Sequence, residues 1–155
     1  MTLRPIAIAR LQSYSYTKQA VLNTQLEIKA LESEMKAIRS AGISDSVPSG
    51  GVKSLEDKLV SIILKIREME LSYARAKSRA EAVDNALSTL AQQERLILYR
   101  LYIAPEKGSL LKLCEEMDCE MASVYRRRNK ALDHFTFSLF GCLDTDELHN
   151  EGVYL

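Results

Sequence analysis

The sequence predicts an all-α protein in which a long two-helix coiled-coil hairpin is followed by a C-terminal helix-turn-helix domain. Three observations predict this fold. The 155 residues include 6 Gly, 3 Pro and no Trp, with 46% hydrophobic and 27% charged residues, a composition typical of long helices. Apolar residues recur with heptad spacing through the first 90 residues. A short helix, a tight turn and a longer helix are then indicated within residues 91–140.

The first long helix is indicated by a seam that starts at Tyr14. Steps of three and four residues meet only apolar side chains or Thr, at Tyr14, Thr17, Val21, Thr24, Ile28, Leu31, Met35 and Ile38. The pattern fails at Ser40, and Pro48, Gly50 and Gly51 follow closely. We therefore expect a loop over about residues 41–53.

The second long helix is predicted to begin near Ser54, which with Asp57 has approximately the spacing of a capping box. Its seam has eleven apolar members, Leu55, Leu59, Ile62, Ile66, Met69, Tyr73, Ala76, Ala80, Val83, Leu87 and Leu90. A helix from Ser54 to Leu90 would be about 55 Å long, so it should project from a small domain. The loop permits an antiparallel hairpin, although a parallel dimer or a four-helix dimer satisfies the same heptads. Either way, we expect homo-oligomerisation through the coiled coil.

The C-terminal pattern predicts three shorter helices. An amphipathic helix marked by Leu98, Leu101 and Tyr102 should end at Ala104–Gly108, where Pro and Gly oppose continuation. We expect Ser109 to cap a short helix that runs through Glu116. A tight turn at residues 117–119 then leads into a helix from about Glu120 to Phe140, which completes a helix-turn-helix outline.

A basic face is predicted on this last helix. Ser123, Arg126, Arg127 and Lys130 follow i, i+3, i+4 and i+7 spacing, opposite the side that bears Val124, Ala131 and Phe135. Arg can donate two hydrogen bonds to guanine in the major groove, and Lys can neutralise phosphate. Double-stranded DNA is therefore the expected partner. The alternative is that the run from Arg126 to Arg128 is an ordinary solvated surface.

The runs LSTLAQQERLILYRLYI and SLLKLCEEMDCEMASVYRRRNKALDHF resemble the last conserved region, region 4, of sigma-70 factors. Residues 90–140 look still more like phage-encoded transcriptional regulators of the RinA and ArpU type. The resemblance implies control of phage or prophage late genes, and it makes host RNA polymerase a candidate partner. It also matches Tyr125 to the recognition helix, which adds Tyr125 to the candidate DNA-binding residues. Asp118 stands where this family usually has the Gly of the turn.

Other functional classes have little support in the sequence. Neither His134 nor His149 has ligand-spaced neighbours for a metal, and no motif for a catalytic site or a cofactor is present. Three cysteines without a CxxC pair suit a reducing cytoplasm, and no apolar run approaches a membrane span. We expect residues 141–155 to form an acidic, flexible tail. Two alternatives to a regulator remain open, a DNA-packaging subunit of the small terminase kind and a structural coiled-coil adaptor.

Overall fold

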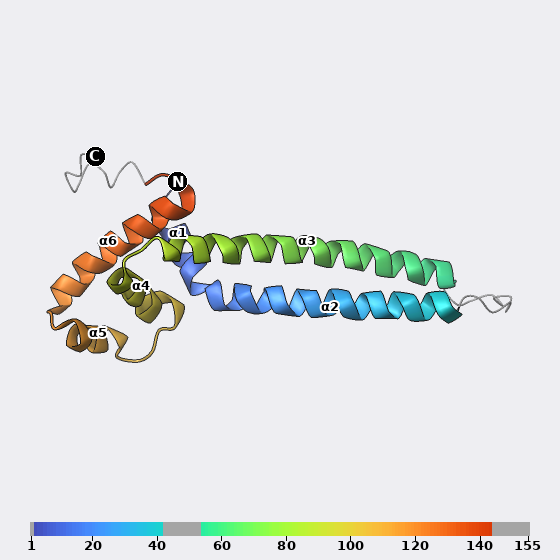
Figure 1. The fold of residues 1–155 in the computed structure, drawn as a ribbon, viewed down its shortest axis with the longest axis horizontal. Helices are drawn as coiled ribbons and strands as arrows, with labels where there is room; N and C mark the ends of the chain where they lie inside the picture. Colours follow the sequence, from blue (N-terminus) through green and yellow to red (C-terminus); the bar gives the residue numbers. More distant parts are fainter. Residues whose placement is uncertain (1, 42–53, 144–155) are drawn as a thin grey trace. The chain divides into compact units, whose positions relative to one another are not determined.

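A computed structural model of the chain describes residues 2–41 and 54–143, and in these residues it contains helices and no strand. The helices labelled in Figure 1 are α1 (Leu3–Gln12), α2 (Tyr14–Ala41), α3 (Leu55–Ser88), α4 (Gln92–Leu98), α5 (Ser109–Met117) and α6 (Met121–Phe140), and a π-helical turn, η1 (Tyr99–Ile103), follows α4. The predicted all-α class is therefore confirmed. Apart from residues 41 and 141–143, the predicted loop and acidic tail lie outside the described residues. The chain divides into two compact units, residues 17–78 and residues 1–16 with 79–155.

The unit of residues 17–78 is a helical hairpin in which α2 and α3 run antiparallel (Figure 1). All eight predicted seam residues of α2 are buried or half-buried, and of the other α2 residues only Ala20 is not exposed. On α3, every seam residue after Leu55 is likewise buried or half-buried. The Thr24 hydroxyl donates to the Ala20 carbonyl at 2.7 Å, which satisfies this polar group within the helix. The predicted seam is thus the face along which the hairpin packs.

The start of α3 follows from a side-chain cap. The backbone N–H of Asp57 donates to Ser54 Oγ at 3.2 Å, which satisfies one of the helix's unpaired N-terminal donors. Glu56 and Asp57 lie in the first turn, where negative charge interacts favourably with the helix dipole. The predicted helix start is confirmed, whereas the helix ends at Ser88, two residues before the predicted Leu90.

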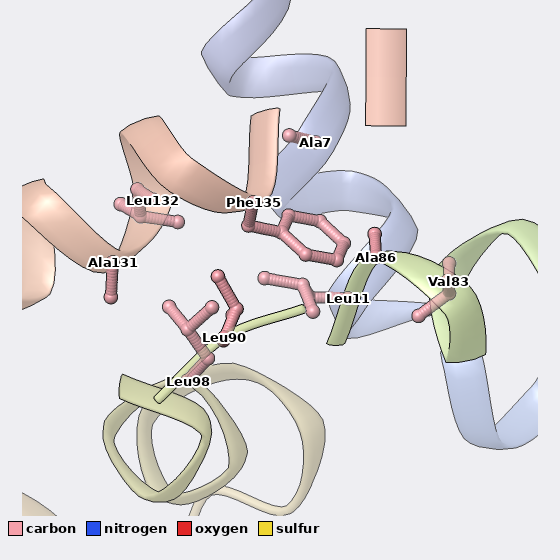
Figure 2. Packing of buried hydrophobic residues seen from close by; sticks show 9 residues of the cluster. All are labelled: Ala7, Leu11, Val83, Ala86, Leu90, Leu98, Ala131, Leu132 and Phe135. Atoms are coloured by element: carbon pink, nitrogen blue, oxygen red, sulfur yellow. The ribbon is translucent and has the colours of Figure 1, made fainter. Parts of the chain in front are cut away.

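The second unit is built around a core that joins α1, the end of α3, α4 and α6 (Figure 2). Phe135 of α6 is fully buried among Leu11 of α1, Ala86 of α3 and Leu98 of α4. An ion pair between Arg4 and Asp133 also joins α1 to α6. The heptad seam did not predict α1 as a separate helix, because its pattern begins only at Tyr14. A break at Ser13 lets Ala7 and Leu11 bury themselves in this core.

Candidate nucleic-acid interface

The helix-turn-helix has its own small core. Ile97 of α4, Leu113 of α5 and Val124 of α6 are fully buried against one another. Half-buried apolar residues surround these three, namely Leu96, Leu101, Leu110, Cys114, Met117 and Cys119. Because each helix contributes one central residue, the start of α6 is held by two other helices. This is the rigid support that a recognition helix needs.

The supporting helix changes its winding before it ends. It is α-helical to Leu98 and continues as a π-helical turn from Tyr99 to Ile103, where the Ala104 N–H donates to the Tyr99 carbonyl at 2.9 Å. Within this turn, Arg100 Nη2 donates to Glu116 Oε1 of α5 at 2.9 Å. The helix ends before Pro105, as the sequence predicted, but the π-helical turn was not expected.

The turn between α5 and α6 is a Schellman motif. The Cys119 N–H donates to the Cys114 carbonyl at 3.1 Å, and the Asp118 N–H donates to the Glu115 carbonyl at 3.3 Å. Asp118 lies in the left-handed region with φ 49°, the conformation for which Gly is usual. Asp tolerates it better than most residues, because its short polar side chain can bond locally. The sharp turn therefore forms with Asp in the left-handed position, without a glycine.

The beginnings of the two motif helices are fixed differently. The Glu120 carbonyl accepts from the Ser123 and Val124 N–H groups at 3.0 and 3.1 Å, which starts α6 without any side-chain cap. Ser109 was predicted as the cap of α5, but this prediction is wrong, because Gly108 is the capping residue. Ser109 is instead the first helical residue, and its buried hydroxyl accepts from the Glu106 N–H at 2.9 Å and donates to the Glu106 carbonyl at 2.8 Å.

The structure places four of the five predicted site residues on one face of α6. Arg126, Arg127 and Lys130 are exposed and Ser123 is half-buried. Val124, Ala131 and Phe135 on the opposite side are fully buried, as the spacing predicted. Arg126 Nη2 donates to Ser123 Oγ at 3.1 Å, so its guanidinium bonds a neutral group. We call Ser123, Arg126, Arg127 and Lys130 the basic face.

The charges of the basic face are not offset by ion pairs in the part of the chain that the structure describes. Among the described residues, no ion pair involves any of its three cationic side chains. Among the other cations of this unit, Lys112 Nζ lies 3.2 Å from Glu106 Oε2 and Arg100 is bonded to Glu116, whereas Arg95 and Lys107 have no ion pair within residues 2–41 and 54–143. Arg126, Arg127 and Lys130 differ from these isolated cations because they lie within five consecutive residues of one helix, which makes α6 the most densely basic exposed segment of this unit.

The fifth predicted residue, Tyr125, lies on a different flank of the helix. The guanidinium carbon of Arg128 lies 4.8 Å from the centroid of the Tyr125 ring, a cation–π contact. Arg128 also donates from Nη2 to Asn129 Oδ1 at 3.0 Å. Sequence reasoning left Arg128 out of the site, although its i, i+3 spacing from Tyr125 could have indicated the pair. The structure thus adds a second polar flank beside the basic face.

Acidic side chains border the site on the turn side. Glu115, Asp118 and Glu120 are exposed, whereas the charge of Glu116 is offset by Arg100. Since like charges repel, these carboxylates disfavour an approach of phosphate over the turn. A polyanion is therefore favoured along the first half of α6 and disfavoured beside Asp118.

A further contact fixes the middle of α6 to the start of α4. His134 Nδ1 lies 2.7 Å from Glu94 Oε1, and Glu94 Oε2 accepts from the Ala91 N–H at 3.3 Å. Glu94 therefore connects α4, which supports the motif, with α6. No group of three or more potential metal ligands occurs in residues 2–41 and 54–143. The same residues include no helix with the length and apolar character needed to cross a membrane.

Comparison with known proteins gives no match to a protein-family model, to a curated protein or to a solved structure.

Proposed function

We propose that the chain is a sequence-specific DNA-binding transcriptional regulator that inserts the first half of α6 into the major groove. The observation that carries this proposal is the basic face, with three exposed cations that have no ion pair among the described residues, on a helix held by the α4–α5–α6 core. A solvated surface would explain the exposure of these side chains. It would not require their placement at the start of the second helix of a helix-turn-helix, where base edges are reached first.

The chemistry assigns different roles to the members of the basic face. Arg126 and Arg127 can each present two parallel N–H donors to guanine, a contact worth about 1–3 kcal/mol of discrimination between bases. Lys130 lies farther along the helix and suits a phosphate oxygen, which contributes affinity without sequence selectivity. The Ser123 hydroxyl can donate or accept, so it can serve a base or a phosphate.

The biological setting of the proposal rests on the resemblance to RinA and ArpU regulators. On that basis the chain acts in the cytoplasm of a bacterial host and controls phage or prophage late genes. Host RNA polymerase is the further partner that the resemblance proposes. Self-association through the α2–α3 hairpin would present two recognition helices, which favours an operator with paired half-sites.

The proposal is tested by selecting bound fragments from phage and host genomic DNA at near-physiological salt. The wild-type chain should enrich one promoter-proximal site, and the Arg126→Ala/Arg127→Ala variant should lose that enrichment. A matched control removes two exposed cations from the hairpin, with Lys29→Ala/Lys36→Ala, and should enrich the same site as the wild type.

Other outcomes distinguish the alternatives. Enrichment next to a packaging gene, together with ring-sized particles in solution, would replace the regulator by a DNA-packaging subunit. Absence of enrichment with the wild-type chain would refute DNA recognition and leave the motif as a structural scaffold.

A further inference from the structure

The outer side of α3 carries apolar residues that the hairpin does not cover. Val60, Leu64 and Leu71 are 56, 55 and 60% exposed, although the seam residues of the same helix after Leu55 are buried or half-buried. They follow i, i+4 and i+11 spacing, so they form a row along one side of the helix. We call these three residues the outer row. Large aliphatic side chains aligned in this way indicate a contact surface rather than scattered surface leucines.

The charged residues around the outer row change sign midway between Leu64 and Leu71. Residues 64–71 read Leu-Lys-Ile-Arg-Glu-Met-Glu-Leu, so two basic residues precede the point between residues 67 and 68 and two acidic residues follow it. Lys65, Arg67, Glu68 and Glu70 are all exposed, and none of them forms an ion pair within residues 2–41 and 54–143.

This pattern is self-complementary when two such helices meet antiparallel. A two-fold axis at residues 67 and 68 sets Leu64 opposite Leu71 of the second copy. On the flanks, it brings Arg67 toward the second copy's Glu70 and Lys65 toward the second copy's Glu68. A parallel, in-register arrangement would instead place the basic half of each segment at the level of the basic half of the other, which is less favourable.

We infer that the outer row is a dimerisation surface on which α3 of a second copy of this chain packs antiparallel. The inference deepens the self-association within the proposed function and rests on it. The occupant is a second copy because both the apolar positions and the charges of residues 64–71 complement themselves. α2 offers no equivalent: its exposed Leu22 and Leu26 have no such ordered charges around them.

The size of the surface predicts a reversible dimer. The part of α3 from Asp57 to Ser78 is about 33 Å long and a helix is about 10 Å wide, so roughly 330 Å² per copy can be covered. A stable interface usually buries about 800 Å² per partner. The dimer should therefore form and dissociate with protein concentration, and should be strengthened when DNA holds two copies close together.

Sedimentation equilibrium of the full chain without DNA, over about a hundredfold range of concentration, tests the surface. The wild type should shift from monomer toward dimer, and Leu64→Glu/Leu71→Glu should remain monomeric with unchanged helix content, since both positions are exposed. The control Leu22→Glu/Leu26→Glu adds the same charges to exposed leucines of α2 and should dimerise like the wild type. Equal loss in both variants, or a wild type that stays monomeric, would overturn the inference.

A charge exchange tests the antiparallel register. Arg67→Glu should weaken dimerisation at least tenfold because it faces Glu70 of the second copy, and Arg67→Glu/Glu70→Arg should restore it. If the double variant dimerises no better than the single variant, the register is wrong. Loss of DNA recognition with dimerisation intact would refute only the proposed function. Monomeric wild-type protein that still selects one DNA site would refute only this surface.

Discussion

The replacement Phe135→Ala tests the core that joins α1, α3, α4 and α6. The Phe135 ring is fully buried, so its removal takes away apolar contacts and leaves a cavity. Truncation of such a residue costs about 3–5 kcal/mol, a large part of the roughly 5–15 kcal/mol by which a domain is stable. With a urea dependence of about 2 kcal/mol per molar, the unfolding midpoint should fall by about 2 M. Urea titration followed by circular dichroism measures this shift.

Phe137 provides the matched control. It lies two residues later in the same helix but is 51% exposed, so Phe137→Ala should change stability by about 0.5 kcal/mol or less. Equal destabilisation by the two replacements would refute the packing of α6 described above. A negligible effect of Phe135→Ala alone would show that this ring is not part of the core.

Three further predictions concern backbone geometry and ion pairing. Asp118→Gly should raise the free energy of unfolding by up to about 1 kcal/mol, because residue 118 has a left-handed backbone conformation, whereas Asp118→Val should lower it. Urea titration measures both changes, and the reverse order would contradict the structure of this turn. Ser54→Ala should cost about 1 kcal/mol in thermal unfolding because the Asp57 N–H loses its acceptor, and an unchanged midpoint would argue against the cap. Asp133→Asn should speed proteolysis of the N-terminal helix by weakening the bond with Arg4, and protection equal to the wild type would exclude a role for this pair.

The hairpin could be predicted because the heptad spacing of apolar residues determines which faces of its two helices pack together. In α2 the heptad residues are, together with Ala20, the ones withdrawn from solvent, and among the seam residues of α3 only Leu55 at the helix start is exposed. The short helix α1 could not be found in this way, because it lies before the seam begins. Its burial depends on Phe135, a residue more than 120 positions away, and periodicity within one helix contains no information about such a contact.

The candidate site was predictable where its geometry depends only on the spacing of residues within one helix. The spacing of Arg126, Arg127 and Lys130 places them on the same face in any regular α-helix. The surroundings of Tyr125 depend on which neighbouring side chain stacks on its ring, and in the structure that side chain is Arg128. The hydroxyl of Ser109 was misassigned because Ser suits both a cap and the first helical position, and only the three-dimensional path of residues 106–109 decides between them.

The proposed function requires that the basic face of α6 binds DNA in a sequence-specific manner. Its most direct test is the affinity of the full chain for the selected fragment and for a scrambled fragment, measured at several salt concentrations. The Arg126→Ala/Arg127→Ala/Lys130→Ala variant should lose the preference for the selected fragment, and its log-log salt slope should fall by about 0.9 for each lost phosphate contact. The Lys29→Ala/Lys36→Ala/Arg39→Ala control, which removes exposed cations of α2, should keep both properties. Affinity and preference that survive the α6 replacements would contradict the claim.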